Sequence, residues 1–322
     1  MMRDAIVEFA KQFYYAPTVE RPSRKKYRHV IVAGMGGSHL SADVLKGYDP
    51  TLSLEVHCDY GIPFIAPEKR KHTVFIASSY SGNTEETLDA FHRAGKQGID
   101  RAAFSVGGAL IKMACKANVP YVRMPDTGIQ PRSALGFSIK ALAALMGLDN
   151  AADDFSRLAK TLKPLAYEQK GKLLARRLRG LVPIVYASNV NESIAYNWKI
   201  KFNETGKIPA FYNVLPELNH NEMTGFDIAP STEKLSKRFS VLLLHDDADH
   251  PRIIKRMDIL KRLYVRRGLA CENIRMSGTT RLMRMFSSLV LADWAAYYTA
   301  EQYGLESEQV PMVEEFKKLM VK

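Results

Sequence analysis

Short apolar runs rich in β-branched residues alternate with segments of helical periodicity along this chain of 322 residues. Five such runs stand in the first half, at residues 30–33, 52–56, 73–77, 102–106 and 119–122. An apolar helix is predicted to follow them at 135–148. The second half repeats the pattern, with predicted strands at 182–187 and 239–244 and predicted helices ending at 202, 267, 303 and 321. This alternation predicts parallel sheets with helices on both faces.

The pattern stops once and then restarts, which predicts two domains. A polar, Lys-rich stretch at 150–172 is interpreted as a helical linker between the halves. We therefore expect an α/β chain with an N-terminal domain at residues 1–150 and a C-terminal domain at 151–322, each a mostly parallel sheet flanked by helices. The length fits two domains of about 150 residues. No close internal repeat is visible, so the duplication is one of pattern only.

Composition excludes several classes of protein. Hydrophobic residues make up 46% of the chain and charged residues 25%, as in ordinary globular proteins. No apolar stretch is long enough to span a membrane, so no membrane partner is expected. The cysteines, Cys58, Cys115 and Cys271, lack paired spacing. This excludes a disulfide framework and a Cys-based zinc site, predicts no metal, and fits a reducing cytoplasm.

The net charge of +12 allows nucleic acid or a small anion as a partner. Basic residues concentrate at 21–28 and at 252–267. In the second stretch the apolar residues recur at helical spacing, which predicts an amphipathic helix with a solvated basic face. Neither stretch interleaves aromatic residues as single-strand binding platforms do. We therefore predict no nucleic-acid partner.

A hydroxyl-rich turn follows the predicted strand at 73–77. Residues 78–84, SSYSGNT, precede a predicted helix. A helix N-terminus offers free N–H groups and a positive partial charge, which suit a phosphate. Ordinary helix capping is the alternative, because Ser, Thr and Asn are the commonest N-caps. Capping needs one such residue and this turn contains five, which favours a pocket for a phosphorylated ligand.

An earlier glycine turn, residues 34–39, also follows a predicted strand. It begins like the dinucleotide fingerprint G-x-G-x-x-G, but its sixth residue is His39, so the match to a nicotinamide-linked enzyme is weak. A single His at such a place is more commonly a partly buried helix residue. In the alternative interpretation, Gly36 and Gly37 bring the backbone close to the sheet edge. Ser38 then faces the same crevice as the turn at 79–84.

Three further polar residues are candidates for chemistry. Arg132 stands at the start of a predicted helix, where the macrodipole disfavours a cation. This conflict is compatible with a functional role, and a plain surface arginine is an equal alternative. Glu204 ends a predicted helix, where a carboxylate charge is disfavoured, and it suits a general base. His220 lies between two asparagines, and histidine is a residue type that commonly moves protons. A polar turn with Asx capping is the alternative for the histidine segment. Glu217 and Glu222 compete as bases, but their neighbours suggest that they brace this turn.

Several strings together resemble a known family. The segment SYSGNTEET at 79–87 resembles the phosphosugar-binding signature of SIS (sugar isomerase) domains. With GMGGS at 34–38, PRSAL at 131–135 and PELNHNE at 216–222, the chain resembles the bifunctional phosphoglucose/phosphomannose isomerase family. That family is built from two SIS domains. The resemblance extends from about residue 30 to the C-terminal helix.

The resemblance implies roles for matching positions. Phosphate binding is implied for Gly37, Ser38, Ser79, Ser81 and Thr84. It implies that Arg132 stabilises an enediolate and that Glu204 is the base. It also implies that His220 opens the sugar ring from the neighbouring subunit of a homodimer. A C-terminal lysine near the ring oxygen corresponds to Lys317, with Lys318 as the neighbouring alternative.

The implied reaction interconverts glucose 6-phosphate and fructose 6-phosphate through a cis-enediol, without metal or organic cofactor, and extends to mannose 6-phosphate. In the family a hydroxyl residue before the last helix is associated with the mannose epimer. Val310 stands there in this chain, so glucose activity is predicted more firmly than mannose activity. The alternative function is a non-catalytic SIS-type phosphosugar sensor, which has no use for Glu204 and His220.

Overall fold

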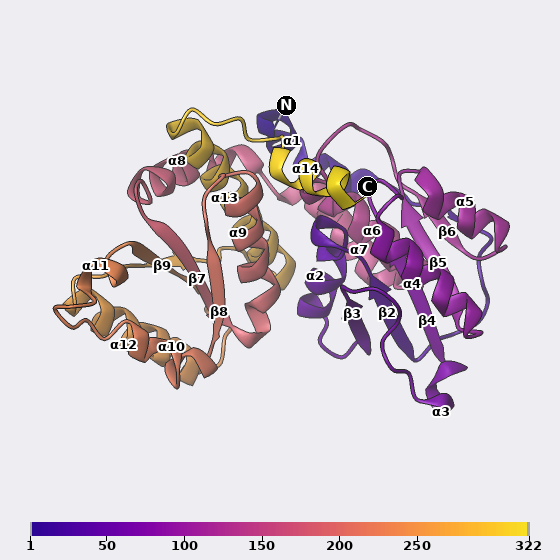
Figure 1. Ribbon diagram of the computed structural model, residues 1–322, viewed down its shortest axis with the longest axis horizontal. Coiled ribbons are helices and arrows are strands. Elements are labelled where there is room, and N and C mark those ends of the chain that lie inside the picture. The colour runs from indigo at the N-terminus through magenta and orange to yellow at the C-terminus, as the bar shows by residue number, and fades with distance from the viewer. Residues whose placement is uncertain (1, 321–322) are drawn as a thin grey trace. The chain divides into compact units, whose positions relative to one another are not determined.

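The computed structural model describes residues 2–320, and the packing of the chain divides it into two compact units (Figure 1). The first unit is Glu8–Leu162, and the second combines Met1–Val7 with Lys163–Lys322. These units differ from the predicted ranges 1–150 and 151–322 in two places. Helix α1 (Met2–Val7) belongs to the second unit, and helix α7 (Asp149–Thr161) belongs to the first.

Both differences have a simple packing cause. Helix α1 buries Met2 and Ile6 and contacts α13 (Arg281–Gln302), a helix of the second unit. Helix α7 buries Phe155 and Leu158 and packs against the 3₁₀ helix η1 (Phe9–Tyr14). The stretch predicted as a linker is helical, but its helices bury apolar faces in the units.

A mostly parallel sheet forms the centre of the first unit. Among the described residues its strands run in the order β1 (Val19–Glu20), β6 (Tyr121–Arg123), β5 (Asp100–Ser105), β4 (Thr73–Ser78), β2 (His29–Ala33) and β3 (Leu54–His57). Neighbours pair in parallel except β1, which is antiparallel to β6. The five strands predicted in this half are confirmed. The two-residue β1 is too short to leave a pattern in the sequence.

Helices cover both faces of this sheet. Helices α4 (Glu85–Lys96) and α5 (Gly108–Lys116) pack on the face that carries Ile31, Phe75 and Ala103. Helices α2 (Leu40–Tyr48) and α6 (Leu135–Met146) belong to the other layer. Every residue of β4 is therefore buried, as expected for the central strand of a parallel sheet.

The second unit contains a smaller, wholly parallel sheet. Within the described residues its strand order is β10 (Ala270–Arg275), β9 (Phe239–His245), β7 (Val182–Ser188) and β8 (Phe211–Leu215). Figure 1 shows α9 (Glu192–Glu204) and α13 (Arg281–Gln302) on one face and α12 (Pro251–Arg266) on the other. Thus the predicted class, α/β with two mostly parallel sheets flanked by helices, is confirmed. Strands β8 and β10 are missing from the prediction because these edge strands mix polar and half-exposed residues.

Short helical elements complete both units. The first unit adds η2 (Gly36–Ser38), α3 (Pro67–Arg70) and η3 (Pro131–Ser133). The second adds η4 (Pro164–Tyr167), α8 (Glu168–Arg177), η5 (Asn189–Asn191), η6 (Glu217–Asn219), α10 (Glu222–Gly225), α11 (Glu233–Ser236) and α14 (Pro311–Met320). Residue 321, at the end of the last predicted helix, lies outside the described residues. Each helix within residues 2–320 is too short or too polar to span a bilayer.

A buried ion pair joins α9 to α13 in the second unit. The Lys201 ammonium lies 2.5 Å from the Asp293 carboxylate, and the two residues are 3% and 8% exposed. One turn earlier on α9, the Trp198 indole donates to the Ser288 hydroxyl at 3.0 Å. These contacts fix the rotation of α9 against α13, and Glu204 is the last residue of α9.

We expect Asp293→Ala to lower the free energy of unfolding by about 3–5 kcal/mol, because it leaves the Lys201 charge buried without its partner. Urea denaturation of the two proteins measures the difference. The matched control is Glu272→Ala, which breaks the more exposed Arg177–Glu272 pair and should cost less than about 1 kcal/mol. Equal losses in the two variants would contradict the prediction.

A partly buried ion pair stands at the start of α2. The His39 ring is nearly buried, and its Nδ1 lies 2.6 Å from the Asp43 carboxylate. Burial lowers the pKa of the imidazole, but hydrogen bonds to Asp43 and then Cys58 outweigh this effect and raise the pKa of His39 to about 9. His39 is therefore a charged, structural residue at neutral pH.

Because this pKa is raised above the ordinary value of about 6.5, the pair stabilises the fold fully below pH 6.5. We expect that stabilisation, on the order of 3 kcal/mol, to be lost as the pH rises through about 9. Asp43→Asn should flatten the pH dependence of unfolding between pH 6.5 and 9. Asp247→Asn is the control, because its Arg275 partner lowers the pKa of Asp247 and it titrates far below this window. The prediction fails if both variants keep the slope of the parent protein.

Candidate functional site

Four connecting segments meet at the carboxyl edge of the first sheet. Three follow the neighbouring strands β2, β4 and β5: residues 34–38, 79–84 and 106–107. The fourth is η3, which precedes α6 and contains Arg132. Open parallel sheets bind ligands at this edge, between the strand ends and the following helices.

The hydroxyl-rich turn at 79–84 is held by its own side chains. Ser79 is fully buried, and its Oγ lies 2.8 Å from the Thr84 Oγ1 and accepts a hydrogen bond from the Gly82 N–H at 3.0 Å. Ser81 is exposed, and its Oγ accepts from the Asn83 N–H at 3.2 Å. Thr84 is the N-cap of α4 but makes no capping hydrogen bond with its side chain. The turn is thus more than a capped helix start.

Two hydrogen bonds connect this turn to the glycine turn before it. The Ser38 Oγ accepts from the Tyr80 N–H at 3.0 Å, and the Ser78 Oγ donates to the Ser38 carbonyl at 2.5 Å. Ser38 is nearly buried. The two turns therefore lie side by side at the ends of β2 and β4.

A close backbone approach packs the turn at 79–84 against the turn after β5. A Cβ on Gly82, which has a φ of +73°, would lie 1.9 Å from the Gly107 carbonyl oxygen. The Leu110 N–H donates to the Gly82 carbonyl at 2.9 Å, and the Ala109 N–H donates to the Asn83 side chain at 3.0 Å. Only glycine fits at position 82, and the turn is rigid as a result.

Arg132 is brought to the same edge by a second close approach. A Cβ on Gly37 would lie 2.9 Å from the Arg132 backbone nitrogen. Arg132 is 3% exposed, and its Nη1 donates to the Gln130 side chain at 3.4 Å. The glycine turn and η3 are therefore in van der Waals contact. Gly37, Ser38 and Arg132 all lie in the first unit.

Sequence reasoning missed Gln12, which supports η3 from η1. Its Nε2 donates to the Ser133 carbonyl at 2.7 Å, and its Oε1 accepts from the Gly136 N–H at 2.9 Å. The side chain is buried, so it fixes the start of α6 and with it the segment that carries Arg132. A glutamine within the apolar segment 9–13 was the available signal.

In the second unit, Glu204 ends α9 and is half-buried. The Lys207 ammonium donates to the Glu204 carbonyl at 2.6 Å and also to the Gln309 carbonyl. Lys207 adopts a left-handed backbone, with φ of +59°, which turns the chain back over the helix end. The carboxylate thus extends from a helix terminus that is itself fixed by the Lys201–Asp293 pair.

His220 follows β8, the Leu215–Pro216 cis peptide and η6. Its side chain is exposed, and its backbone N–H donates to the Glu217 carbonyl at 2.9 Å. The neighbouring asparagines hold the turn. Asn219 accepts from Arg256 of α12 at 3.2 Å, and Asn221 donates to Glu217 at 2.9 Å.

Glu222 is also engaged, because Tyr186 and Asn213 both donate to its carboxylate. Burial and the nearby Glu222 raise the pKa of Tyr186, so the phenol stays protonated as a donor. The carboxylates of Glu217 and Glu222 therefore brace the His220 turn, in line with their lower rank as candidate bases.

Lys317 lies on α14, where the Nζ is 2.8 Å from the Glu314 carboxylate and every residue from 311 to 320 is exposed. Lys318 is exposed on the same helix. The structure thus gathers Gly37, Ser38, Ser79, Ser81, Thr84 and Arg132 in the first unit. Glu204, His220 and Lys317 belong to the second unit.

Comparison with known proteins identifies the family of this chain. The family described as "Bacterial phospho-glucose isomerase C-terminal SIS domain" matches residues 167–320. The bifunctional phosphoglucose/phosphomannose isomerase of Caldicellulosiruptor bescii is 36% identical over 305 residues, covering 89% of this chain and 88% of that protein. The protein of the same description from Aquifex aeolicus is 33% identical over 305 residues, covering 92% of this chain and 91% of that protein.

Among solved structures, the tagatose-6-phosphate ketose/aldose isomerase of Escherichia coli superposes with a TM-score of 0.67. It is 17% identical, with 95% of this chain and 88% of that chain covered, and so supports the fold alone. The two curated relatives cover nearly the whole chain at identities above 30%. The chain therefore belongs to the bifunctional phosphoglucose/phosphomannose isomerase family.

Proposed function

We propose that this chain is a cytoplasmic, cofactor-independent isomerase that interconverts glucose 6-phosphate and fructose 6-phosphate, and also accepts mannose 6-phosphate. The observation that carries the proposal is the edge of the first sheet. There a rigid hydroxyl turn at a helix N-terminus lies beside a buried arginine, Arg132. The relatives named for this activity match the chain over both units.

The phosphate group binds at the hydroxyl turn in this proposal. Helix α4 starts at Glu85 without a side-chain cap, so its first N–H groups are available to an anion. Exposed Ser81 and half-buried Thr84 add hydroxyl donors, while buried Ser38 and Ser79 maintain the shape of the turn. Binding energy from this end of the substrate orients the distant reacting carbons.

Glu204 moves the proton between C2 and C1. Isomerisation passes through a cis-enediol, and one carboxylate can remove a proton from one carbon and return it to the other. The negative charge that develops on the enediolate oxygen needs a fixed cation, which is the role proposed for Arg132. The guanidinium is suited to it because burial strengthens its electrostatic effect.

His220 opens the sugar ring, acting from the partner subunit of a homodimer, and Lys317 assists near the ring oxygen. The exposure of the His220 side chain in a single chain supports a role across an interface. Two asparagines and two glutamates hold its turn in shape, which pre-organises an exposed imidazole. Val310 directly precedes α14, and the proposal gives glucose the better turnover of the two epimers.

Glu204→Gln should lower kcat by about 100-fold or more on both glucose 6-phosphate and mannose 6-phosphate, with little change in KM, because it removes proton transfer and leaves phosphate binding intact. Coupled assays on the two substrates side by side measure this. Glu192→Gln, at the other end of α9, is the matched control and should keep the parent activity. Near-parental turnover in Glu204→Gln would refute the mechanism. Tight sugar-phosphate binding without turnover in the parent protein would favour the sensor.

Mixing two inactive variants tests the origin of His220. In a dimer of Glu204→Gln and His220→Ala chains, one of the two sites receives an intact Glu204 from one chain and an intact His220 from the other. Random exchange makes about half the dimers mixed, so we expect recovery of about a quarter of parental activity. If His220 acts within its own chain, mixing restores nothing. Mixing either variant with itself is the control.

A further inference from the structure

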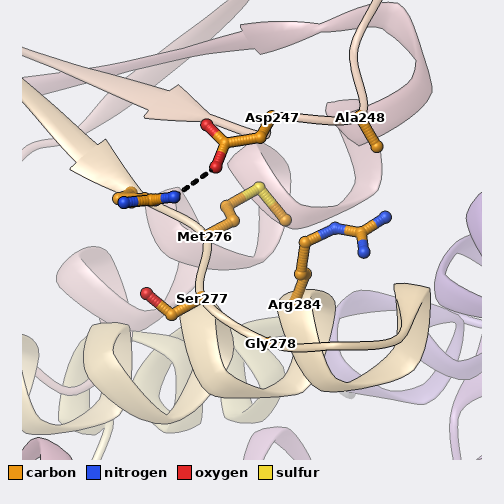
Figure 2. A pocket seen from close by; sticks show the side chains of 7 residues that line it. Asp247, Ala248, Met276, Ser277, Gly278 and Arg284 are labelled. Carbon is orange, nitrogen blue, oxygen red and sulfur yellow. Dashed lines mark hydrogen bonds and ion pairs between the residues drawn. The ribbon is translucent and has the colours of Figure 1, made fainter.

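The carboxyl edge of the second sheet holds a cavity of about 370 Å³ that the proposed reaction does not use. It is lined by Asp247, Ala248, Arg275, Met276, Ser277, Gly278 and Arg284 (Figure 2). These residues follow β9 and β10 and begin α13. Like the hydroxyl turn of the first unit, the cavity lies at the carboxyl edge of a parallel sheet, which is where such sheets bind ligands.

Arg284 is the central group of this cavity. Its side chain is 17% exposed and lies 2.7 Å from the buried Asp246 carboxylate. The Nε makes this ion pair, although not with the geometry of a hydrogen bond, and no hydrogen bond of the Arg284 Nη atoms is found among the described residues. Figure 2 shows the Arg284 side chain rising from α13, with its guanidinium turned to the side of the cavity where Ala248 lies. The Nη end of the guanidinium therefore keeps donors that an anion in the cavity can fill.

The neighbouring arginine shows the contrast. Arg281 donates to Asn191, to Asp246 at 2.9 Å and to the Val190 carbonyl at 2.9 Å. Its donors are consumed within the fold, and its role is structural. Arg284 shares the same carboxylate partner but faces the cavity.

A second cation stands at the rim. Arg275 pairs with Asp247 at 2.5 Å, and both side chains are largely exposed. Figure 2 marks the hydrogen bond to Asp247 with a dashed line. An exposed pair of this kind rearranges at small cost when a competing anion arrives. Two guanidiniums can then meet one anion from both sides.

The backbone of the cavity floor favours the same charge. A Cβ on Gly278 would lie 2.6 Å from the Met283 Cβ and 2.8 Å from the Arg284 nitrogen, so the loop runs directly against the first turn of α13. Helix α13 has 22 residues, and its N-terminal end carries a positive partial charge. This partial charge adds to the positive charges of Arg275 and Arg284.

We propose that this cavity is a second anion-binding site, which takes the phosphate group of a small phosphorylated metabolite between Arg284 and Arg275. Its volume lies within the range of small-molecule pockets and exceeds what a bare phosphate needs. The planar guanidinium of Arg284 suits two phosphate oxygens at once. The site uses residues of the second unit alone, and it holds whether or not the chain is an isomerase.

Thermal unfolding of the full chain tests the proposal, because a ligand that binds the folded state raises Tm in proportion to its occupancy. The background variant is Thr84→Val, which weakens the hydroxyl turn of the first unit. Inorganic phosphate and ribose 5-phosphate are titrated against sodium chloride at equal ionic strength. Arg284→Gln should weaken the apparent affinity for both by about tenfold or more, since it removes charge-assisted hydrogen bonds.

Arg266→Gln is the matched control, because it removes the same charge from an exposed position on α12. Unchanged affinity in Arg284→Gln, or no phosphate-dependent rise in Tm in the Thr84→Val background, overturns the proposal. If Arg284→Gln does not fold, Arg275→Gln replaces it, since that side chain is 73% exposed. It should show the same loss, and its failure to do so also overturns the proposal. Tighter binding of ribose 5-phosphate than of phosphate identifies a metabolite as the source of the anion, whereas equal binding identifies free phosphate.

Discussion

Backbone-to-backbone packing at the carboxyl edge of the first sheet is the constraint on which the candidate site depends. At Gly37 and at Gly82 there is no room for a Cβ, because the neighbouring segment already fills that space. These two contacts join three turns and η3 into one rigid body. The side-chain hydroxyls then complete the hydrogen bonds between the turns. Because the backbone of Arg132 is itself packed against the glycine turn, this arginine lies close to the hydroxyls. Pre-organisation of this kind lowers the entropic cost of holding a phosphate.

The second unit achieves rigidity by a different means. Its candidate base lies at the end of a long helix rather than in a turn, and a helix end frays unless tertiary contacts hold it. The buried Lys201–Asp293 pair supplies that contact one turn before Glu204. Replacing such a pair with apolar residues often costs little stability. The Lys201–Asp293 pair fixes one rotation of α9 against α13. Nonpolar packing would specify this rotation less strictly.

The features that could be predicted from the sequence are those that depend on residues close together along the chain. Central strands such as β4 bury both faces and so appear as continuous apolar runs in the sequence, whereas β8 and β10 are edge strands whose mixed residues resemble loops. The hydroxyl turn was recognisable in the sequence because its hydroxyl residues are neighbours along the chain. Gln12 was not, because its contacts lie more than 120 residues away in the sequence. Likewise, the sequence offered no reason to assign helix α1 to the second unit.

The two sheets also differ in how they meet negative charge. The first edge offers hydroxyls and backbone N–H groups, with the charged Arg132 in an adjacent segment. If phosphate binds there as proposed, few charges hold it, and it can be released at each turnover. The second edge offers arginines that are already partly neutralised by Asp246 and Asp247. An anion bound there must compete with these carboxylates, and its occupancy therefore depends on ligand concentration. A catalytic site benefits from the first arrangement, and a site that reports on metabolite level benefits from the second.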